Sequence, residues 1–329
     1  MFERFVAAAP GHQTAVDLFR DRWVSRLPVD GLTTGSMDLF FERDPRPRQA
    51  AEACGGLEGL EVLELGSLEG GHTYQLEQLG AKGVLGIDAS PEMYLKSLIA
   101  KEVLALKAQF LPGDFNRYLE AKPRTFDLVF ACGVLYHMID PVHTLYLIAQ
   151  TAPRVFIWTH YLNEAHAAHC RAKSVTVHGF TCDYYEVPYD DSSHSRGWAG
   201  IHQSAHRIER QTLLDALHHV GFVDVKVIED TPDHPGGPAL TVAGHNPNFG
   251  NREDLGQRLE RAEGEARYYR ELCEQLREET SALQRQLNQP AEGAANVQQQ
   301  LKTMLESNSW RLTEPLRRGR RWARRLWSS

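Results

Sequence analysis

The chain has 329 residues, 42% hydrophobic and 24% charged, which suits one full globular domain with additions. No stretch approaches the roughly 20 apolar residues of a membrane span, and Met1 to Pro10 is too short and too acidic for a secretory signal, so we expect a cytoplasmic protein. The net charge is −7, but Ser309 to Ser329 holds seven arginines and one glutamate, which leaves an acidic body of −13 that disfavours a nucleic-acid partner.

Residues 1–58 form a predicted helical extension before the core domain. Apolar residues recur at helical spacing from Thr14 to Arg26, and Pro28 ends the pattern. Two positions fit such a helix equally well, one over a ligand site and one against a sheet edge.

From residue 59 to residue 245, strand and helix patterns alternate as in a doubly wound parallel sheet, which predicts an α/β fold. Seven strands are expected, at 60–65, 83–88, 108–112, 126–132, 154–159, 223–229 and 239–244. Helices are expected between them at about 71–79, 91–106, 141–151 and 209–220.

The stretch from Glu61 to Thr73, EVLELGSLEGGHT, indicates a buried strand that turns sharply into a helix. Gly66 suits the tight turn and lets a ligand approach the backbone. The spacing Glu64, Gly66, Gly70 is neither the dinucleotide fingerprint nor a phosphate-binding P-loop. A second acid, Asp88, ends the next apolar run.

This pattern resembles motif I and the acidic end of strand 2 in class I S-adenosylmethionine-dependent methyltransferases. The resemblance implies that the glycine turn lies against the amino-acid part of S-adenosylmethionine and that Asp88 accepts hydrogen bonds from both ribose hydroxyls. It also implies a Rossmann-like methyltransferase sheet whose last strand runs antiparallel. The cofactor residues that it implies are Glu64, Gly66, Ser67, Gly70, Asp88, Ala89, Asp114, Phe115, Cys132 and Gly133.

Three further segments carry the resemblance, which covers about residues 59–244. Asp114 and Phe115 follow the third strand, where the family places an acid and an apolar residue beside the adenine. The segment 126–141, FDLVFACGVLYHMIDP, resembles a subset that includes the wobble-uridine carboxymethyltransferases of bacterial tRNA and many small-molecule and sugar methyltransferases. The segment 219–230 resembles the helix end that leads into the sixth strand.

Methyl transfer to a hydroxyl needs a base that works near neutral pH, and histidine is the natural choice. His160 and His137 end adjacent predicted strands on the reactive side, since ligands bind outside the carboxyl ends of such strands. We expect His160 to be the base, with His137 as the next candidate. A structural, hydrogen-bonded role for either histidine is the alternative.

Residues 161–206 are longer than a simple connection, which predicts a substrate-facing insertion. Aromatic and acidic side chains there suit a sugar or another polyhydroxylated acceptor. We expect the acceptor to contact Tyr136, Tyr161, Tyr184, Tyr185 and Glu186. His166, His169 and Cys170 share one helix face but lack a clear fourth ligand, so a solvated histidine-rich helix is favoured over a metal site.

The C-terminal part changes character. Residues 251–306 carry a heptad seam of more than four repeats, which predicts a coiled coil and a homo-oligomer; the alternative is a single helix folded back on the domain.

Residues 307–329 predict a basic amphipathic helix with tryptophans, which suits an anionic membrane surface. This tail also resembles tails of bacterial enzymes that build surface polysaccharides. RNA binding and docking on the acidic body are the alternatives.

These patterns predict an S-adenosylmethionine-dependent methyltransferase that O-methylates a sugar of a bacterial surface glycan or its precursor, at the inner face of the membrane. One alternative is a small-molecule or tRNA-modifying transferase, including carboxymethyl transfer. That enzyme should hold the extra carboxylate with a cation near the cofactor, and no lysine or arginine stands beside the motifs. The other alternative is a non-catalytic scaffold of a polysaccharide-assembly complex.

Overall fold

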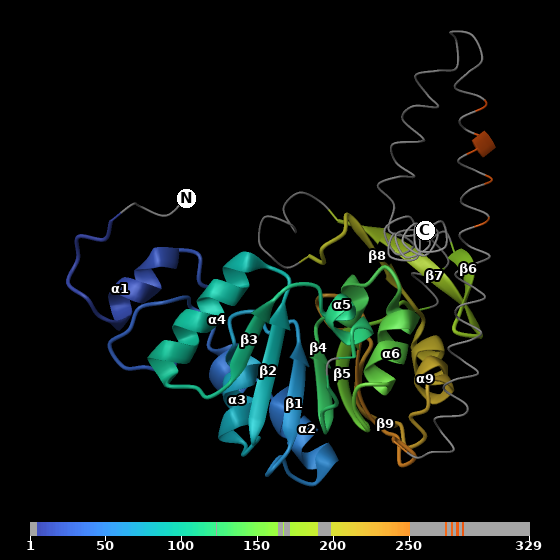
Figure 1. Cartoon of the computed structure of the whole chain (residues 1–329), viewed down its shortest axis with the longest axis horizontal. Helices are drawn as coiled ribbons and strands as arrows, with labels where there is room; N and C mark the ends of the chain where they lie inside the picture. Colours follow the sequence, from blue (N-terminus) through green and yellow to red (C-terminus); the bar gives the residue numbers. More distant parts are fainter. Residues whose placement is uncertain are drawn as a thin grey trace, which may run out of the picture. The chain divides into compact units, whose positions relative to one another are not determined.

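The computed structural model describes residues 5–122, 124–163, 167, 172–189 and 199–250, together with 274, 278, 281, 282 and 285. The chain divides into two units, residues 1–251, whose helices and strands are labelled in Figure 1, and residues 252–329. The predicted coiled coil falls outside the described residues, apart from those five helical positions, and the predicted tail falls outside them entirely. No helix in the described part of the chain is long and apolar enough to cross a membrane.

Seven strands form the central sheet in the order β3-β2-β1-β4-β5-β10-β9. The first five are mutually parallel, whereas β10 runs antiparallel to both of its neighbours. Their bounds are β1 Glu61–Leu65, β2 Gly83–Asp88, β3 Gln109–Pro112, β4 Leu128–Cys132, β5 Arg154–His160, β9 Lys226–Thr231 and β10 Ala239–His245. The predicted doubly wound sheet with an antiparallel last strand is confirmed.

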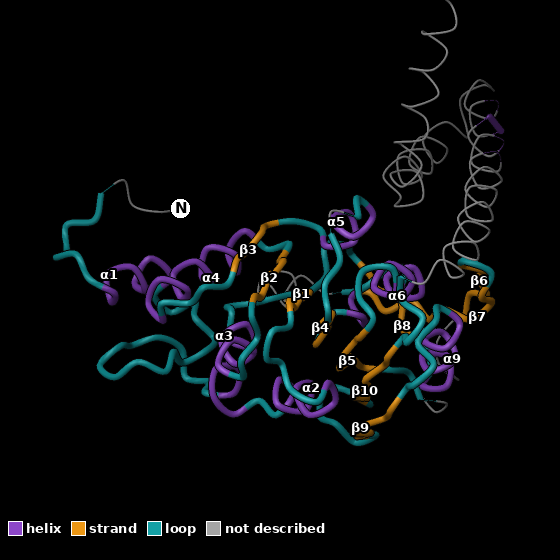
Figure 2. Tube along the Cα trace, turned by 60° about the horizontal axis from the view of Figure 1, so that its bottom comes forward, coloured by secondary structure: helices purple, strands orange, loops and turns teal. Residues whose placement is uncertain are grey.

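Helices cover both faces of this sheet (Figure 2). On one face, α2 (Arg46–Cys54), α3 (Gly71–Gln78) and α4 (Pro91–Leu104) pack over a core that includes Phe130 and Phe156, whose rings stack 5.4 Å apart. On the other face lie α5 (Phe115–Glu120), α6 (Pro141–Ala149) and α9 (Arg210–His219) over the larger core.

The helices on the reactive side begin at capping residues supplied by the strand ends. Asp114 caps α5 and Asp140 caps α6, each accepting a backbone N–H from the first turn. Ser90 caps α4 in the same way, and proline at the first helical position follows both Ser90 and Asp140. These starts place the loops after β2, β3 and β4 side by side at one edge of the sheet.

The predicted helix at 14–26 is wrong. Only α1 (His12–Val16) and a 3₁₀ turn (Asp17–Phe19) form, and the chain then runs irregularly to α2. The backbone N–H groups of Val24 and Ser25 donate to the Glu69 carboxylate, at 3.0 and 2.8 Å, so they make no helical bonds. A short π-helix at Leu39–Arg43 contacts α3.

The insertion contains a three-stranded antiparallel sheet that the periodicity did not predict, made of β6 (Ala172–Val177), β7 (Phe180–Pro188) and β8 (Ser204–Arg207). Its last strand attaches to the loop after β4, because the His206 backbone N–H donates to the Met138 carbonyl and Nδ1 bonds the Ile139 carbonyl. His166, His169 and Cys170 lie outside the described residues.

Candidate active site

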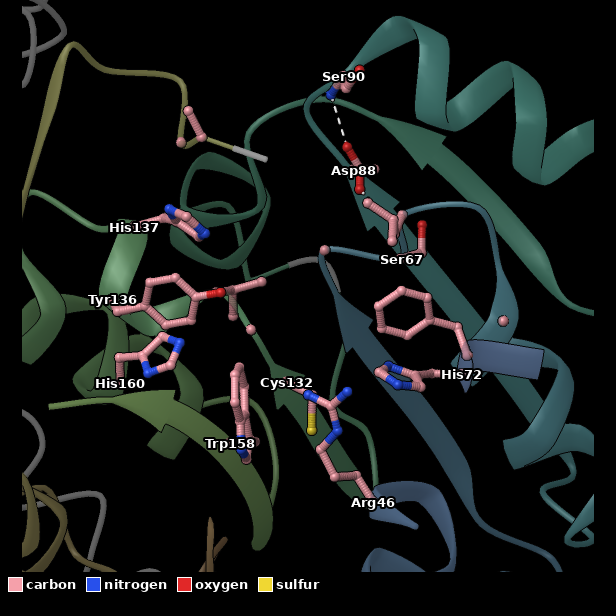
Figure 3. Close-up of a pocket in the computed structure, with 18 of the residues that line it drawn as sticks. Arg46, Ser67, His72, Asp88, Ser90, Cys132, Tyr136, His137, Trp158 and His160 are labelled. Atoms are coloured by element: carbon pink, nitrogen blue, oxygen red, sulfur yellow. Dashed lines mark hydrogen bonds between the residues drawn. The ribbon is translucent and has the colours of Figure 1, made fainter. Parts of the chain in front are cut away.

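A cavity of about 840 Å³ opens at the carboxyl ends of β1, β2, β4 and β5. The strand order reverses between β1 and β4, which is where ligands bind in open α/β sheets. Eleven predicted site residues line it: Gly66, Ser67, Asp88, Ala89, Asp114, Phe115, Cys132, Gly133, Tyr136, His137 and His160. Figure 3 shows Asp88 and Ser67 on one side of the cavity, and Tyr136, His137 and His160 on the other.

The glycine turn after β1 is held close to the loop after β4. Gly66 has a φ of 72°, and a Cβ there would meet the Val134 side chain at 2.3 Å. Only glycine fits without a shift of that neighbour. The turn therefore exposes backbone to the cavity, as a nucleotide-type ligand requires.

Asp88 joins this turn to the loop after β2. Its two carboxylate oxygens accept the backbone N–H groups of Leu68 and Ser90, at 2.9 and 2.8 Å. Burial raises the pKa of Asp88, and those two hydrogen bonds act in the opposite direction. Each oxygen keeps a second lone pair for a ligand hydroxyl.

Glu64 and Gly70 do not line the cavity, in contrast to the expectation for cofactor residues. Glu64 is buried beneath the turn and accepts the Thr73 hydroxyl. Burial raises its pKa to about 8. Gly70, with a φ of 86°, caps α3. Both residues therefore support the glycine turn on the side away from the cavity.

His160 ends β5 and faces the other half of the cavity. Its Nδ1 donates to the carbonyl oxygens of Gly237 and Pro238, at 2.8 and 3.2 Å, since a carbonyl can only accept. That bond fixes the proton on Nδ1 and leaves Nε2 as the acceptor. Burial lowers the pKa of His160, so the neutral imidazole prevails at pH 7.

His137 lies beside His160 and is held by the insertion. Its Nδ1 is 2.5 Å from the Tyr189 hydroxyl. Burial lowers the pKa of His137 to about 4, with smaller contributions from the positive charges of Arg207 and His160. Tyr136 packs edge-on against the His160 ring, with ring centroids 4.7 Å apart.

The structure does not bring four predicted acceptor residues to the cavity. The Tyr161 hydroxyl donates to Asp230, the Tyr184 hydroxyl to Asp140 and the Tyr185 hydroxyl to Glu209, while Glu186 accepts the Ser204 hydroxyl. These bonds attach the insertion to the core or pair its strands. Instead, the segment 199–202 of the insertion lines the cavity.

Sequence reasoning assigned no cofactor, acceptor or catalytic role to several residues that line the cavity. They include Arg46, His72, Trp158, His202 and His234. Arg46 corrects the expectation that no cation serves the site: the guanidinium carbon lies 4.6 Å from the Trp158 ring centroid. Trp158 stands two residues before His160 in a strand, a spacing that puts both on one side of the sheet.

Residues 62–154 match the family model described as a methyltransferase domain. The chain is also similar to proteins named tRNA U34 carboxymethyltransferase: it is 30% identical over 122 residues to that of Idiomarina loihiensis and 34% identical over 109 residues to that of Hydrogenovibrio crunogenus. The matches cover 34% and 32% of this chain, and 37% and 33% of those proteins. The chain thus spans about a third of the length of these relatives.

Among solved structures, the N-terminal domain of EvdMO1 in the presence of SAH and D-fucose is similar, with a TM-score of 0.57 and 22% sequence identity. The similarity covers 71% of this chain and 95% of that one. The same domain with SAH bound gives a TM-score of 0.57 and 24% identity. The family match and the shared fold support an S-adenosylmethionine-dependent methyltransferase.

Proposed function

We propose that the chain transfers the methyl group of S-adenosylmethionine to a hydroxyl, with His160 as the base. The observation that carries this proposal is the bond from His160 Nδ1 to the Gly237 carbonyl, which leaves an unprotonated Nε2 at the cavity. The acceptor oxygen forms the new C–O bond as the C–S bond breaks, the sulfonium becomes a neutral thioether, and Nε2 takes the hydroxyl proton. The protein holds the reactants in line and excludes water.

One half of the cavity binds the cofactor and the other half binds the acceptor. The Gly66 turn, Asp88, Asp114 and Phe115 hold the cofactor, with Asp88 on the ribose hydroxyls. Asp114 Oδ1 accepts the Asn116 backbone N–H and Oδ2 lies 3.7 Å from Arg117 Nε, and each oxygen keeps a lone pair for the adenine amine. The acceptor lies among Tyr136, His137 and His160.

The acceptor that we favour is a sugar of a bacterial surface glycan or its precursor. Tyr136 offers an aromatic ring to the cavity, and His137 and His234 offer hydrogen-bonding groups, a mixture that suits a polyhydroxylated ring. The predicted coil would make the chain a homo-oligomer in the cytoplasm, and the basic tail would hold it at the inner face of the membrane. The tail and all but five residues of the coil lie outside the described residues.

Transfer of a labelled methyl group tests the proposal. The full chain is incubated with methyl-labelled S-adenosylmethionine and, separately, with free sugars that include D-fucose, nucleotide-linked sugars and lipid-linked sugars. We expect label in at least one sugar class with the wild type, and about 100-fold less with His160→Gln. No turnover with any sugar, together with label in tRNA, would refute the sugar assignment.

Carboxymethyl transfer to tRNA is the second candidate, and Arg46 favours it. An enzyme of that kind needs a cation at the transferred carboxylate, and Arg46 lines the cavity. The relatives named tRNA U34 carboxymethyltransferase point the same way. Faster transfer from a sulfonium cofactor that carries a carboxymethyl group than from S-adenosylmethionine, with tRNA as acceptor, would establish this candidate. Binding of neither cofactor would favour the scaffold alternative.

A further inference from the structure

Arg46 stands at the start of α2 with its guanidinium fixed in the cavity wall. Its Nε and one Nη donate to the two carboxylate oxygens of Asp44, the first at 2.7 Å. The side chain is 14% exposed, and it lies over the Trp158 ring. Figure 3 shows the guanidinium beside Cys132 and Trp158, directed into the cavity. Arg46 is therefore held in one orientation before any ligand binds.

The guanidinium keeps donors that the protein does not use. Arginine has five N–H donors, and Asp44 takes two of them. No other described residue accepts a hydrogen bond from the Arg46 side chain, and the remaining donors belong to a residue that lines the cavity. A ligand with a planar anion can bind them.

The Asp44 carboxylate does not fully neutralise the Arg46 guanidinium, because Asp44 also accepts hydrogen bonds from other donors. It also accepts the backbone N–H of Arg46 at 3.1 Å and the His72 Nε2–H at 2.8 Å. These bonds keep the pKa of Asp44 well below its usual range despite burial. The hydrogen bonds that join His72, Asp44 and Arg46 orient the guanidinium. A ligand carboxylate can still form stabilising charged hydrogen bonds with it.

We propose that Arg46 binds the α-carboxylate in the amino-acid part of the cofactor, an inference that rests on the proposed function. Arg46 shares the cavity with Gly66, in the turn at which the amino-acid part is expected, and with Cys132, another expected cofactor residue. A carboxylate that leaves water for this cavity needs charged donors, and a guanidinium fork matches its geometry. Arg46 is the residue from the N-terminal segment that supplies them.

Calorimetry with two ligands tests this assignment in the full chain. One ligand is S-adenosylhomocysteine, and the other is the same molecule without its α-carboxylate. We expect the wild type to bind the first about tenfold to a hundredfold more tightly, because of the charged hydrogen bonds. Arg46→Met should reduce that ratio to about one, and Arg46→Lys, which keeps the charge but not the fork, should give an intermediate ratio.

Arg43→Met is the matched control, because Arg43 pairs with Asp38 at 2.8 Å on the surface and does not line the cavity. It should keep the wild-type ratio. An unchanged ratio in Arg46→Met would overturn the assignment, since a merely structural role would weaken both ligands equally. If Arg46→Met keeps the ratio but loses binding of the carboxymethyl-bearing cofactor, the transferred carboxylate replaces the α-carboxylate as the partner. If the wild type binds neither ligand, the proposed function itself fails.

Discussion

Lys96 and Glu69 form a buried ion pair, with Nζ 3.0 Å from Oε1 and both side chains 1% exposed. Lys96 also donates to the Arg22 carbonyl, and Glu69 accepts the N–H groups of Val24 and Ser25. The pair thus ties the segment before α2 to the glycine turn after β1. Because that segment leads into Arg46 at the start of α2, the pair stabilises a wall of the cavity.

We expect Glu69→Gln to lower the free energy of unfolding by about 3 kcal/mol, because the buried Lys96 charge would keep only the partly exposed Glu92, at 3.2 Å, as a carboxylate partner among the described residues. Urea unfolding of the full chain measures the loss. The control is Lys82→Gln, which removes an exposed partner of Glu61 at 3.3 Å and should cost less than about 1 kcal/mol. Equal losses in the two variants would show that the buried pair contributes no more than a surface pair.

His160 should set the acid limb of the pH profile. Because its pKa is lowered, kcat/KM should fall only below about pH 6.5 and should be level above it. His160→Gln should reduce the rate about 100-fold and remove this limb. His245→Gln changes a half-exposed histidine outside the cavity and should retain both. An acid limb that persists in His160→Gln would assign the base to another group, with His137 the first to test.

Glu64 should make stability depend on pH in an unusual direction. Burial raises its pKa to about 8 in the folded chain, from 4.5 for an exposed glutamate. Between these pH values the unfolded chain releases the proton and the folded chain keeps it, so stability falls as pH rises through this window. Urea midpoints at several pH values measure the effect, which Glu64→Gln should remove. A constant difference between wild type and variant across the window would contradict the assignment.

Deletion of Ser309 to Ser329 tests the proposed membrane contact. The seven arginines and the tryptophans should bind vesicles that contain anionic lipid, and association should fall as salt is raised. Sedimentation with such vesicles, compared with vesicles of neutral lipid alone, measures it. The shortened chain should remain in the supernatant with undiminished activity on a soluble acceptor. Sedimentation of the shortened chain with anionic vesicles would refute the role of the tail.

The sequence predicted the sheet well because its inner strands are apolar runs, several of them followed directly by a glycine, as at Gly66, Gly113 and Gly133. Gly66, Asp88 and His160 could be placed at one edge of the sheet, since the carboxyl ends of parallel strands meet there. Arg46 could not be placed, because only the fold brings a residue 20 positions before Gly66 into the cavity. The helix expected at 14–26 failed because Glu69, far along the chain, takes its backbone donors.

The sequence also could not distinguish the roles of three tyrosines, Tyr161, Tyr184 and Tyr185. Their aromatic side chains led us to expect an acceptor site. In the structure each hydroxyl donates to a carboxylate, and these hydrogen bonds anchor the insertion. A tyrosine that binds a sugar and one that anchors a strand have the same pattern in sequence. Only the partners, Asp230, Asp140 and Glu209, distinguish the two roles.

Calorimetric titration of the full chain with S-adenosylhomocysteine, repeated with Asp88→Ala, tests the central claim most directly. We predict one binding event per chain in the wild type, weakened by about 1 to 3 kcal/mol in the variant, because the ribose hydroxyls lose their acceptor. Thermal melting of both proteins confirms that the variant is folded. No binding by the wild type, or equal binding by a folded Asp88→Ala, would contradict the cofactor site described for this cavity.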